Sequence, residues 1–236
     1  MSESYIYGNL QSNTILGTNS GNTGLVGLNN TFIGFQGLTS LINGNENTVV
    51  GSSVANSLVA GSRNSVLGFL SCNSNINGND NTAFGYNTLG ANTISELTAF
   101  GSNALAANTT GPQNTAVGFN ALAANTVGNW NTAIGHNSHA FGLFSDSDTS
   151  VGYNTLSDAA YDGSFNTAIG ARAMEATAFG IENTAVGSSA LLALTDGSEN
   201  VAMGTVSLVS LTTGSSNVGI GYNSLAFMHY KMYRLY

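Results

Sequence analysis

The stretch NTAVGFNALAANT, residues 114–126, has Asn and Thr at both ends, one Gly in the middle and no charged residue. A similar stretch, NTAIGHNS, begins 17 residues later, at residue 131. When the chain is aligned on Asn-Thr-x-apolar-Gly, the Gly recurs in steps of 17, apart from one step of 16 and one of 18. A fixed period of this length indicates a repeat architecture. The thirteen rung glycines are Gly17, Gly34, Gly51, Gly68, Gly85, Gly101, Gly118, Gly135, Gly152, Gly170, Gly187, Gly204 and Gly221.

Two apolar columns run through this alignment. The residue before each rung glycine is apolar in every copy, so this column is predicted to form the core: Leu16, Ile33, Val50, Leu67, Phe84, Phe100, Val117, Ile134, Val151, Ile169, Val186, Met203 and Ile220. The fourth residue after the glycine is predicted to be a second buried column: Leu89, Leu105, Leu122, Leu156, Met174, Leu191, Leu208 and Leu225. Cys72 stands in this second column, and we expect it to be a small apolar core residue.

The composition of each repeat favours strands over helices. Gly, Asn, Ser and Thr interrupt every repeat, so no window keeps a helical period for the ~10 residues that a helix needs. Thr-Ala-Val-Gly-Phe alternates like a strand, and the polar segment after it is typical of turns. We therefore predict an all-β fold, a parallel β-solenoid or β-roll of about thirteen 17-residue rungs over residues 13–226. A second Gly column, ten residues after the first, is expected to mark a bend or a close backbone approach.

The two ends differ from the repeats. Residues 1–12 are predicted to be an N-terminal cap or attachment segment, and residues 227–236 an aromatic and basic C-terminal cap or anchor. Trp130, at a turn between rungs, is expected to be half exposed and is a candidate for stacking on a glycan. The other candidate partner contacts are Tyr230, Tyr233 and Tyr236.

Asn and Thr form two further columns. Asn side chains stacked in register are predicted to hydrogen-bond along a ladder that is interrupted at Leu97 and Asp148. The Thr residues lie two positions before the rung glycine's apolar neighbour and are therefore expected to point inward with it. An outward Thr array would suit binding to ice, so the expected inward direction argues against that function. The Thr column is Thr14, Thr31, Thr48, Thr82, Thr98, Thr115, Thr132, Thr149, Thr167 and Thr184.

Charge and cysteine content exclude several classes of protein. Only 7% of the residues are charged and the net charge is −8, against roughly 25% charged residues in an ordinary domain. Two of the four basic residues, Lys231 and Arg234, lie in the last six positions, so no basic groove for nucleic acid is expected. The single cysteine allows no intrachain disulfide. No signal peptide and no membrane span are recognised, so we expect synthesis in a cytoplasm.

No catalytic, cofactor-binding or metal-binding residue is predicted. Several acids, Glu46, Asp80, Glu182 and Glu199, recur at the turn before the Asn column, where solvation and capping explain them better than catalysis. Asp146, Asp148, Asp158 and Asp162 cluster where the repeat length is irregular; a solvated acidic loop is favoured there, with a Ca²⁺ site as the alternative. His136 and His139 stand where other repeats have Phe, Tyr or Leu, and are expected to pack rather than to bind metal.

The repeats, such as NTAVGFNALAANT, resemble the 17-residue repeats of phage and prophage tail-fibre proteins, and are similar to the β-roll head repeats of trimeric autotransporter adhesins. The resemblance covers residues 13 to about 230. It implies a homotrimer that serves as a non-enzymatic fibre, spike or decoration on a virus or phage particle, with its termini bound to other virion or fibre proteins. No chaperone domain and no membrane anchor are recognised after the repeats, so we expect the viral alternative rather than the autotransporter one.

Two other functions stay open. The first is an adhesin that binds a host-surface glycan or receptor through the irregular region at about residues 136–165. The second is a β-helical enzyme that degrades polysaccharides with a pair of carboxylates, a chemistry that many parallel β-helices carry out.

Overall fold

A computed structural model describes residues 5–8, 12–158 and 161–227, and describes side chains from residue 12 onward. These residues form strands and turns without a helix. The chain divides into two compact units, Met1–Val117 (unit 1) and Gly118–Tyr236 (unit 2), which are described separately.

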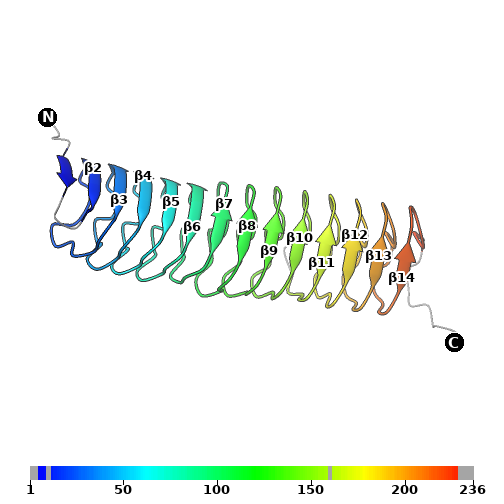
Figure 1. The fold of residues 1–236 in the computed structure, drawn as a ribbon. Coiled ribbons are helices and arrows are strands. Elements are labelled where there is room, and N and C mark those ends of the chain that lie inside the picture. The colour runs from blue at the N-terminus through cyan, green and yellow to red at the C-terminus, as the bar shows by residue number, and fades with distance from the viewer. Residues whose placement is uncertain (1–4, 9–11, 159–160, 228–236) are drawn as a thin grey trace. The chain divides into compact units, whose positions relative to one another are not determined.

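Unit 1 contains one strand per repeat. The strands are β1 (Tyr5–Gly8), β2 (Thr14–Thr18), β3 (Thr31–Phe35), β4 (Thr48–Ser52), β5 (Ser65–Phe69), β6 (Thr82–Tyr86), β7 (Thr98–Phe100) and β8 (Thr115–Val117). From β2 to β8 each strand pairs in parallel with the next, equivalent residues facing each other (Figure 1). β1 pairs antiparallel with β2 and so covers its outer edge. It lies within residues 1–12, the predicted cap or attachment segment.

Unit 2 repeats the same arrangement with shorter strands. These are β9 (Thr132–Ile134), β10 (Thr149–Val151), β11 (Thr167–Ile169), β12 (Thr184–Val186), β13 (Val201–Met203) and β14 (Val218–Ile220), and each is parallel to the next. The predicted all-β parallel solenoid, with one strand in each 17-residue rung, is thus confirmed. The predicted segment 227–236 lies outside the described residues except for Phe227.

The predicted core column was wrong by one position. The buried strand residue stands two places before the rung glycine: Ile15, Phe32, Val49, Val66, Ala83, Ala99, Ala116, Ala133, Ser150, Ala168, Ala185 and Ala202. None of the thirteen residues predicted for the core is buried, and Leu16 and Ile220 are 40% and 68% exposed. Because side chains alternate along a strand, a shift of one position turns the whole column outward. The outward residues are Leu16, Ile33, Val50, Leu67, Phe84, Phe100, Val117, Ile134, Val151, Ile169, Val186, Met203 and Ile220.

The second predicted column is confirmed, because its members are fully buried except Leu225, which is 37% exposed. Cys72 is also buried in it, as predicted. The two interior positions compensate in size in most rungs, although Phe32 shares its rung with Leu38. Val49 and Val66 accompany the small Ala55 and Cys72, whereas rungs with Ala in the strand have Leu or Met in most cases at the second position. A rung of fixed width keeps its interior filled in this way.

The direction predicted for the Thr column was wrong for the same reason. Thr and the apolar residue two places later do share a face, but it is the outer face of the strands. None of the ten Thr residues is buried, and Thr132, Thr149, Thr167 and Thr184 face one another in register along unit 2. The argument against ice binding from an inward Thr column therefore does not hold.

The rung glycines are required by close stacking of the backbone, as predicted. Gly51 has a φ of +142°, and a Cβ at this residue would lie 1.7 Å from the carbonyl oxygen of Gly68. The second Gly column is equally tight, since a Cβ on Gly27 would lie 1.9 Å from the oxygen of Gly44. A side chain at Gly51 or at Gly27 would therefore collide with the backbone of the following rung.

Candidate functional site

The Asn column forms the predicted ladder inside each unit. In unit 1, the amide nitrogen of the Asn47 side chain donates to Oδ1 of Asn30 (2.9 Å) and to the carbonyl of Gly61 (2.8 Å). The backbone N–H of Asn47 donates to the same Oδ1 at 3.0 Å. These side chains are buried, so each rung satisfies the polar groups of the previous rung. Asn166, Asn183, Asn200 and Asn217 repeat this pattern in unit 2.

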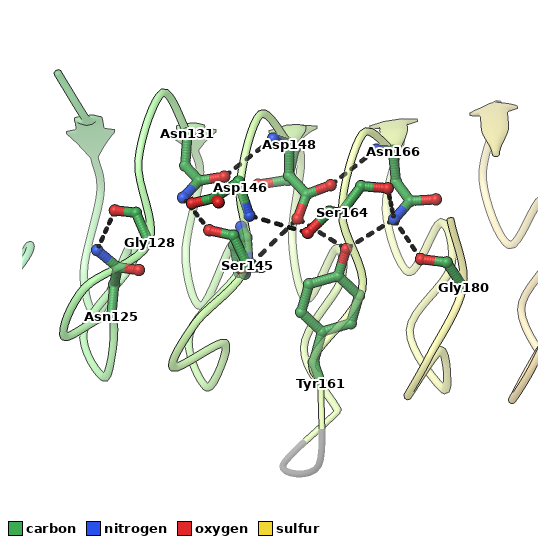
Figure 2. Close-up of polar contacts among 12 residues, drawn as sticks. Asn125, Gly128, Asn131, Ser145, Asp146, Asp148, Tyr161, Ser164, Asn166 and Gly180 are labelled. Carbon is green, nitrogen blue, oxygen red and sulfur yellow. Dashed lines mark hydrogen bonds and ion pairs between the residues drawn. The ribbon is translucent and has the colours of Figure 1, made fainter. Parts of the chain in front are cut away.

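The ladder is interrupted at Asp148 in unit 2 (Figure 2). The backbone N–H of Asp148 still donates to Oδ1 of Asn131 (2.9 Å), and that of Asn166 donates to Oδ1 of Asp148 (2.7 Å). The side-chain amide of Asn166 is instead directed to the hydroxyl of Tyr161 (2.9 Å) and the carbonyl of Gly180 (2.7 Å). Tyr161 donates to Oδ2 of Asp148 at 2.8 Å. A buried phenol thus bridges the side-chain amide of Asn166 and the carboxyl group of Asp148, which would bond directly if the ladder were intact.

His139 packs against this phenol. The two rings are perpendicular, with centroids 4.9 Å apart, and His139 occupies the buried column that holds Leu in other rungs. Space for the imidazole comes from Gly142, where a Cβ would lie 2.3 Å from Nε2 of His139. The structure therefore confirms that His139 packs. Its Nε2 also lies 2.7 Å from Oγ of Ser145.

Ser145, His139 and Asp148 are thereby brought together, a grouping that the sequence did not reveal. It is not a catalytic triad. Nε2 of His139 faces both Ser145 and Asp148, the latter at 3.8 Å, while Nδ1 has no hydrogen-bond partner. A triad requires the acid and the nucleophile on opposite ring nitrogens. All three side chains are also fully buried, so no substrate can reach them.

Burial dominates the protonation of this cluster. It raises the pKa of Asp148 to about 7, although hydrogen bonds from Asn166 and Tyr161 act in the opposite direction. Burial also lowers the pKa of His139 to about 3 and raises that of Tyr161 well above its ordinary value. At neutral pH the imidazole is therefore uncharged, and the carboxyl group of Asp148 is close to its midpoint.

The predicted solvated acidic loop was wrong for Asp148, which is buried, while Asp162 is exposed and Asp146 and Asp158 are half-buried. The four acids lie close in sequence, yet they belong to different sides of the rung. Within the described residues, no group of three or more His, Cys, Asp or Glu side chains is arranged to hold a metal ion. The sequence signal that separates Asp148 from the other three acids is its place in the 17-residue repeat. Asp148 stands in the buried Asn column, and the other three do not.

A hollow of about 460 Å³ lies on the surface of unit 2. Its polar side chains mostly bond to one another: Nε of Arg172 to Glu175 (2.6 Å) and the side-chain amide of Asn154 to Glu175 (3.3 Å). Oδ1 of Asn154 is buried there without a partner. The hollow is lined by Asn137, Phe141, Asn154, Ser157, Asp158, Arg172, Glu175 and Ala176.

Two predicted aromatic positions lie on the surface. His136 stacks between Phe119 (5.1 Å) and Tyr153 (5.5 Å), which confirms a packing role. Trp130 is 58% exposed, as expected. Tyr230, Tyr233 and Tyr236 lie outside the described residues.

The outer face of the strands is uncharged in both units and exposes an apolar column. We define this outer face as two outward columns of strand residues: the apolar residue directly before each rung glycine, and the Thr column. Strands β2–β14 contain no charged residue. On the same strands, rings of neighbouring rungs stack on one another, Phe69 on Tyr86 (5.9 Å) and Phe84 on Phe100 (4.8 Å). Contiguous exposed apolar patches of this kind mark interaction sites in soluble proteins.

Among the described residues, no helix has the length and apolarity needed to cross a membrane. Comparisons with protein-family models, with curated proteins and with solved structures gave no match to this chain.

Proposed function

We propose that this chain is a non-enzymatic structural protein, a β-solenoid fibre, spike or decoration of a virus or phage particle that assembles as a homotrimer. The observation that carries the structural role is the outer face: it is uncharged, repeats on every rung and leaves Leu16, Ile33 and Leu67 at least 40% exposed. The trimer and the viral setting rest on the resemblance of the repeats.

Self-association fits this face energetically. Covering apolar surface stabilises a complex by about 25 cal/mol for each Å² removed from water. Identical copies can meet here without bringing like charges together, because the strands have none. The regular register also gives every rung the same surface, so contacts that form at one rung can recur at its neighbours.

Light scattering coupled to size exclusion tests the oligomer. We expect a mass three times the 24.1 kDa of one chain, whereas the mass of a single chain would contradict self-association. Ile33→Lys puts a charge on the outer face and is expected to dissociate the assembly. Val26→Lys is the matched control: it is also exposed, at 55%, but lies outside the strands and should leave the mass unchanged. Electron microscopy of the purified protein would then show whether the assembly is a short rod or a longer filament.

A second candidate is an adhesin for surface glycans. It is favoured by the exposed Trp130 and by Phe141, 47% exposed, at the edge of the hollow in unit 2. Exposed aromatic rings beside fixed polar groups suit the faces and hydroxyls of sugars. Binding to a glycan array that is lost in Trp130→Ala or Phe141→Ala, with unfolding unchanged, would support the adhesin; no binding by the wild type would exclude it for the sugars tested.

The outward Thr column also makes ice binding testable. Its hydroxyls are in register on β9–β12, but they alternate with apolar side chains of unequal size, such as Ile134 and Val151. An uneven surface matches a crystal lattice poorly. We expect no thermal hysteresis in freezing measurements, and a clear hysteresis would favour ice binding over self-association of this face.

A further inference from the structure

We propose that the rung around Asp148 is a proton-sensitive joint of unit 2. The folded rung holds a proton on the carboxyl group of Asp148, and as the pH rises from about 4 to about 7 the bonds between this rung and the next open more readily. This inference concerns regulation of the fold and goes beyond the structural role proposed above.

Every other described rung has a neutral residue at this position of the ladder. Asn fills the equivalent place in the neighbouring rungs, at Asn131 and Asn166, and Asp148 is as deeply buried as they are. A carboxylate without a countercharge is strongly disfavoured in such an environment and normally takes up a proton.

Among the residues that the structure describes, no Lys or Arg compensates the carboxylate. The titratable groups that face Asp148 or influence it are His139, Tyr161 and the nearby acid Asp146, which adds negative charge. The two arginines of the described residues are paired elsewhere, Arg63 with Asp80 and Arg172 with Glu175.

His139 does not supply the missing charge. Its Nε2 is held by Ser145 and its Nδ1 has no acceptor, so the surroundings offer a protonated ring only one partner. Burial accordingly lowers the pKa of His139 to about 3. Two donors, the backbone N–H of Asn166 and the phenol of Tyr161, favour the ionised carboxylate, but burial outweighs them and raises the pKa of Asp148 to about 7.

The direction of the pH effect follows from proton linkage. An unfolded Asp titrates near pH 3.9, so between about pH 4 and pH 7 the folded rung binds more protons than the open one. The contribution of Asp148 to stability is therefore most favourable below about pH 4, is lost as the pH rises to about 7, and then levels off. From pH 5 to pH 8 the opening constant is expected to rise roughly a hundredfold.

The bonds that would open are those between this rung and the next. They include the N–H of Asn166 to Oδ1 of Asp148 (2.7 Å), the N–H of Thr149 to the carbonyl of Asn166 (2.8 Å) and the N–H of Asp146 to Oγ of Ser164 (3.1 Å). The only 18-residue step of the repeat, from Gly152 to Gly170, lies in this connection.

Hydrogen exchange resolved by peptide, corrected for the intrinsic rate at each pH, tests the joint. We expect the protection of peptides covering residues 145–167 to fall roughly a hundredfold from pH 5 to pH 8, while peptides covering the intact ladder at residues 30–64 of the same molecule keep theirs. Asp148→Asn has nearly the same shape and cannot ionise, so its protection should not depend on pH. Asp146→Asn, which removes a half-buried acid two residues away, is the control: it should keep the pH dependence, with the midpoint moved slightly lower because one nearby negative charge is lost.

Protection that is unchanged with pH in the wild type, or that falls equally in Asp148→Asn, would overturn the proposal. A direct titration covers the case in which Asp148→Asn does not fold. The ¹³C resonance of the Asp148 carboxyl group in the wild-type protein should titrate near pH 7, and a midpoint near the ordinary value for Asp would equally overturn it.

Discussion

Asn47 in unit 1 and Asp148 in unit 2 occupy the same column of the repeat, yet they keep it bonded in different ways. Asn47 both accepts from the rung that follows it in sequence and donates to the one before. Asp148 accepts but has no side-chain amide to donate; Tyr161 bridges it to the side-chain amide of Asn166, and Gly142 leaves space for the neighbouring ring of His139. In this rung the acid is accompanied by changes at several other positions, and we expect the ladder to be destabilised by an acid that lacks them.

Asn47→Asp should give the largest effect, because it introduces the acid without the compensating residues. The new carboxylate would face Oδ1 of Asn30 and the carbonyl of Gly61, both of which now accept from the amide. We expect a loss of about 4 kcal/mol in the free energy of unfolding at pH 8, measured by urea unfolding. A smaller loss at pH 4, where the acid is neutral, would accompany it; a variant as stable as the wild type at pH 8 would contradict the comparison.

Gly142→Ala removes the space that Asp148 and its neighbours depend on. The added Cβ would meet Nε2 of His139, and displacing the ring should cost about 2–3 kcal/mol by thermal or urea unfolding. Gly24→Ala is the control, because its nearest neighbour would be Oδ1 of Asn22 at 3.4 Å and the change should stay within about 0.5 kcal/mol. Equal effects of the two substitutions would rule out the accommodating role of Gly142.

Tyr161→Phe removes the hydroxyl that bridges Asn166 and Asp148. Asp148 loses a hydrogen bond to Oδ2, and the side-chain amide of Asn166 loses one of its acceptors, so we expect a loss of about 1–2 kcal/mol. Because the phenol favours the ionised carboxylate, its removal should raise the pKa of Asp148 further and move the pH-dependent loss of stability upward. Unfolding curves at several pH values would show the shift, and a downward shift would refute the assigned bond.

His139→Leu restores the residue type found in most other rungs. It removes the unpartnered Nδ1 but also the partner of Ser145, so the two effects should nearly cancel, within about 1 kcal/mol. Thermal unfolding at pH 7 measures this. A loss of several kcal/mol would mean that the imidazole stabilises Asp148 directly.

The smallest effect is expected on the surface of the ladder. Arg63 pairs with Asp80 of the following rung at 2.6 Å, but both side chains are largely exposed. Water screens such a pair, so Arg63→Ala should leave the unfolding transition of unit 1 unchanged within error. A measurable destabilisation would show that the outer pair supports the ladder.

Much of the fold was predictable from the period. The 17-residue repeat gave one strand per rung, the rung glycines marked the close approaches, and the Asn column predicted the ladder. The face of the strands was not predictable in this way, because Ile15 and Leu16, or Val49 and Val50, are both apolar. Where the inner residue is Ala, as at Ala116, size misled the prediction, since the larger Val117 is the one outside.

Spacing and composition alone show that this protein is built of repeats, that each rung contains β-structure and that the stacked rungs contain few charged residues. Only the tertiary structure decided which of two apolar columns is inside, and that His139, Ser145, Asp148 and Tyr161 meet. Residues far apart in the period come together through the turns between strands. Burial of the whole rung, rather than the sequence around Asp148, sets the protonation of its carboxyl group.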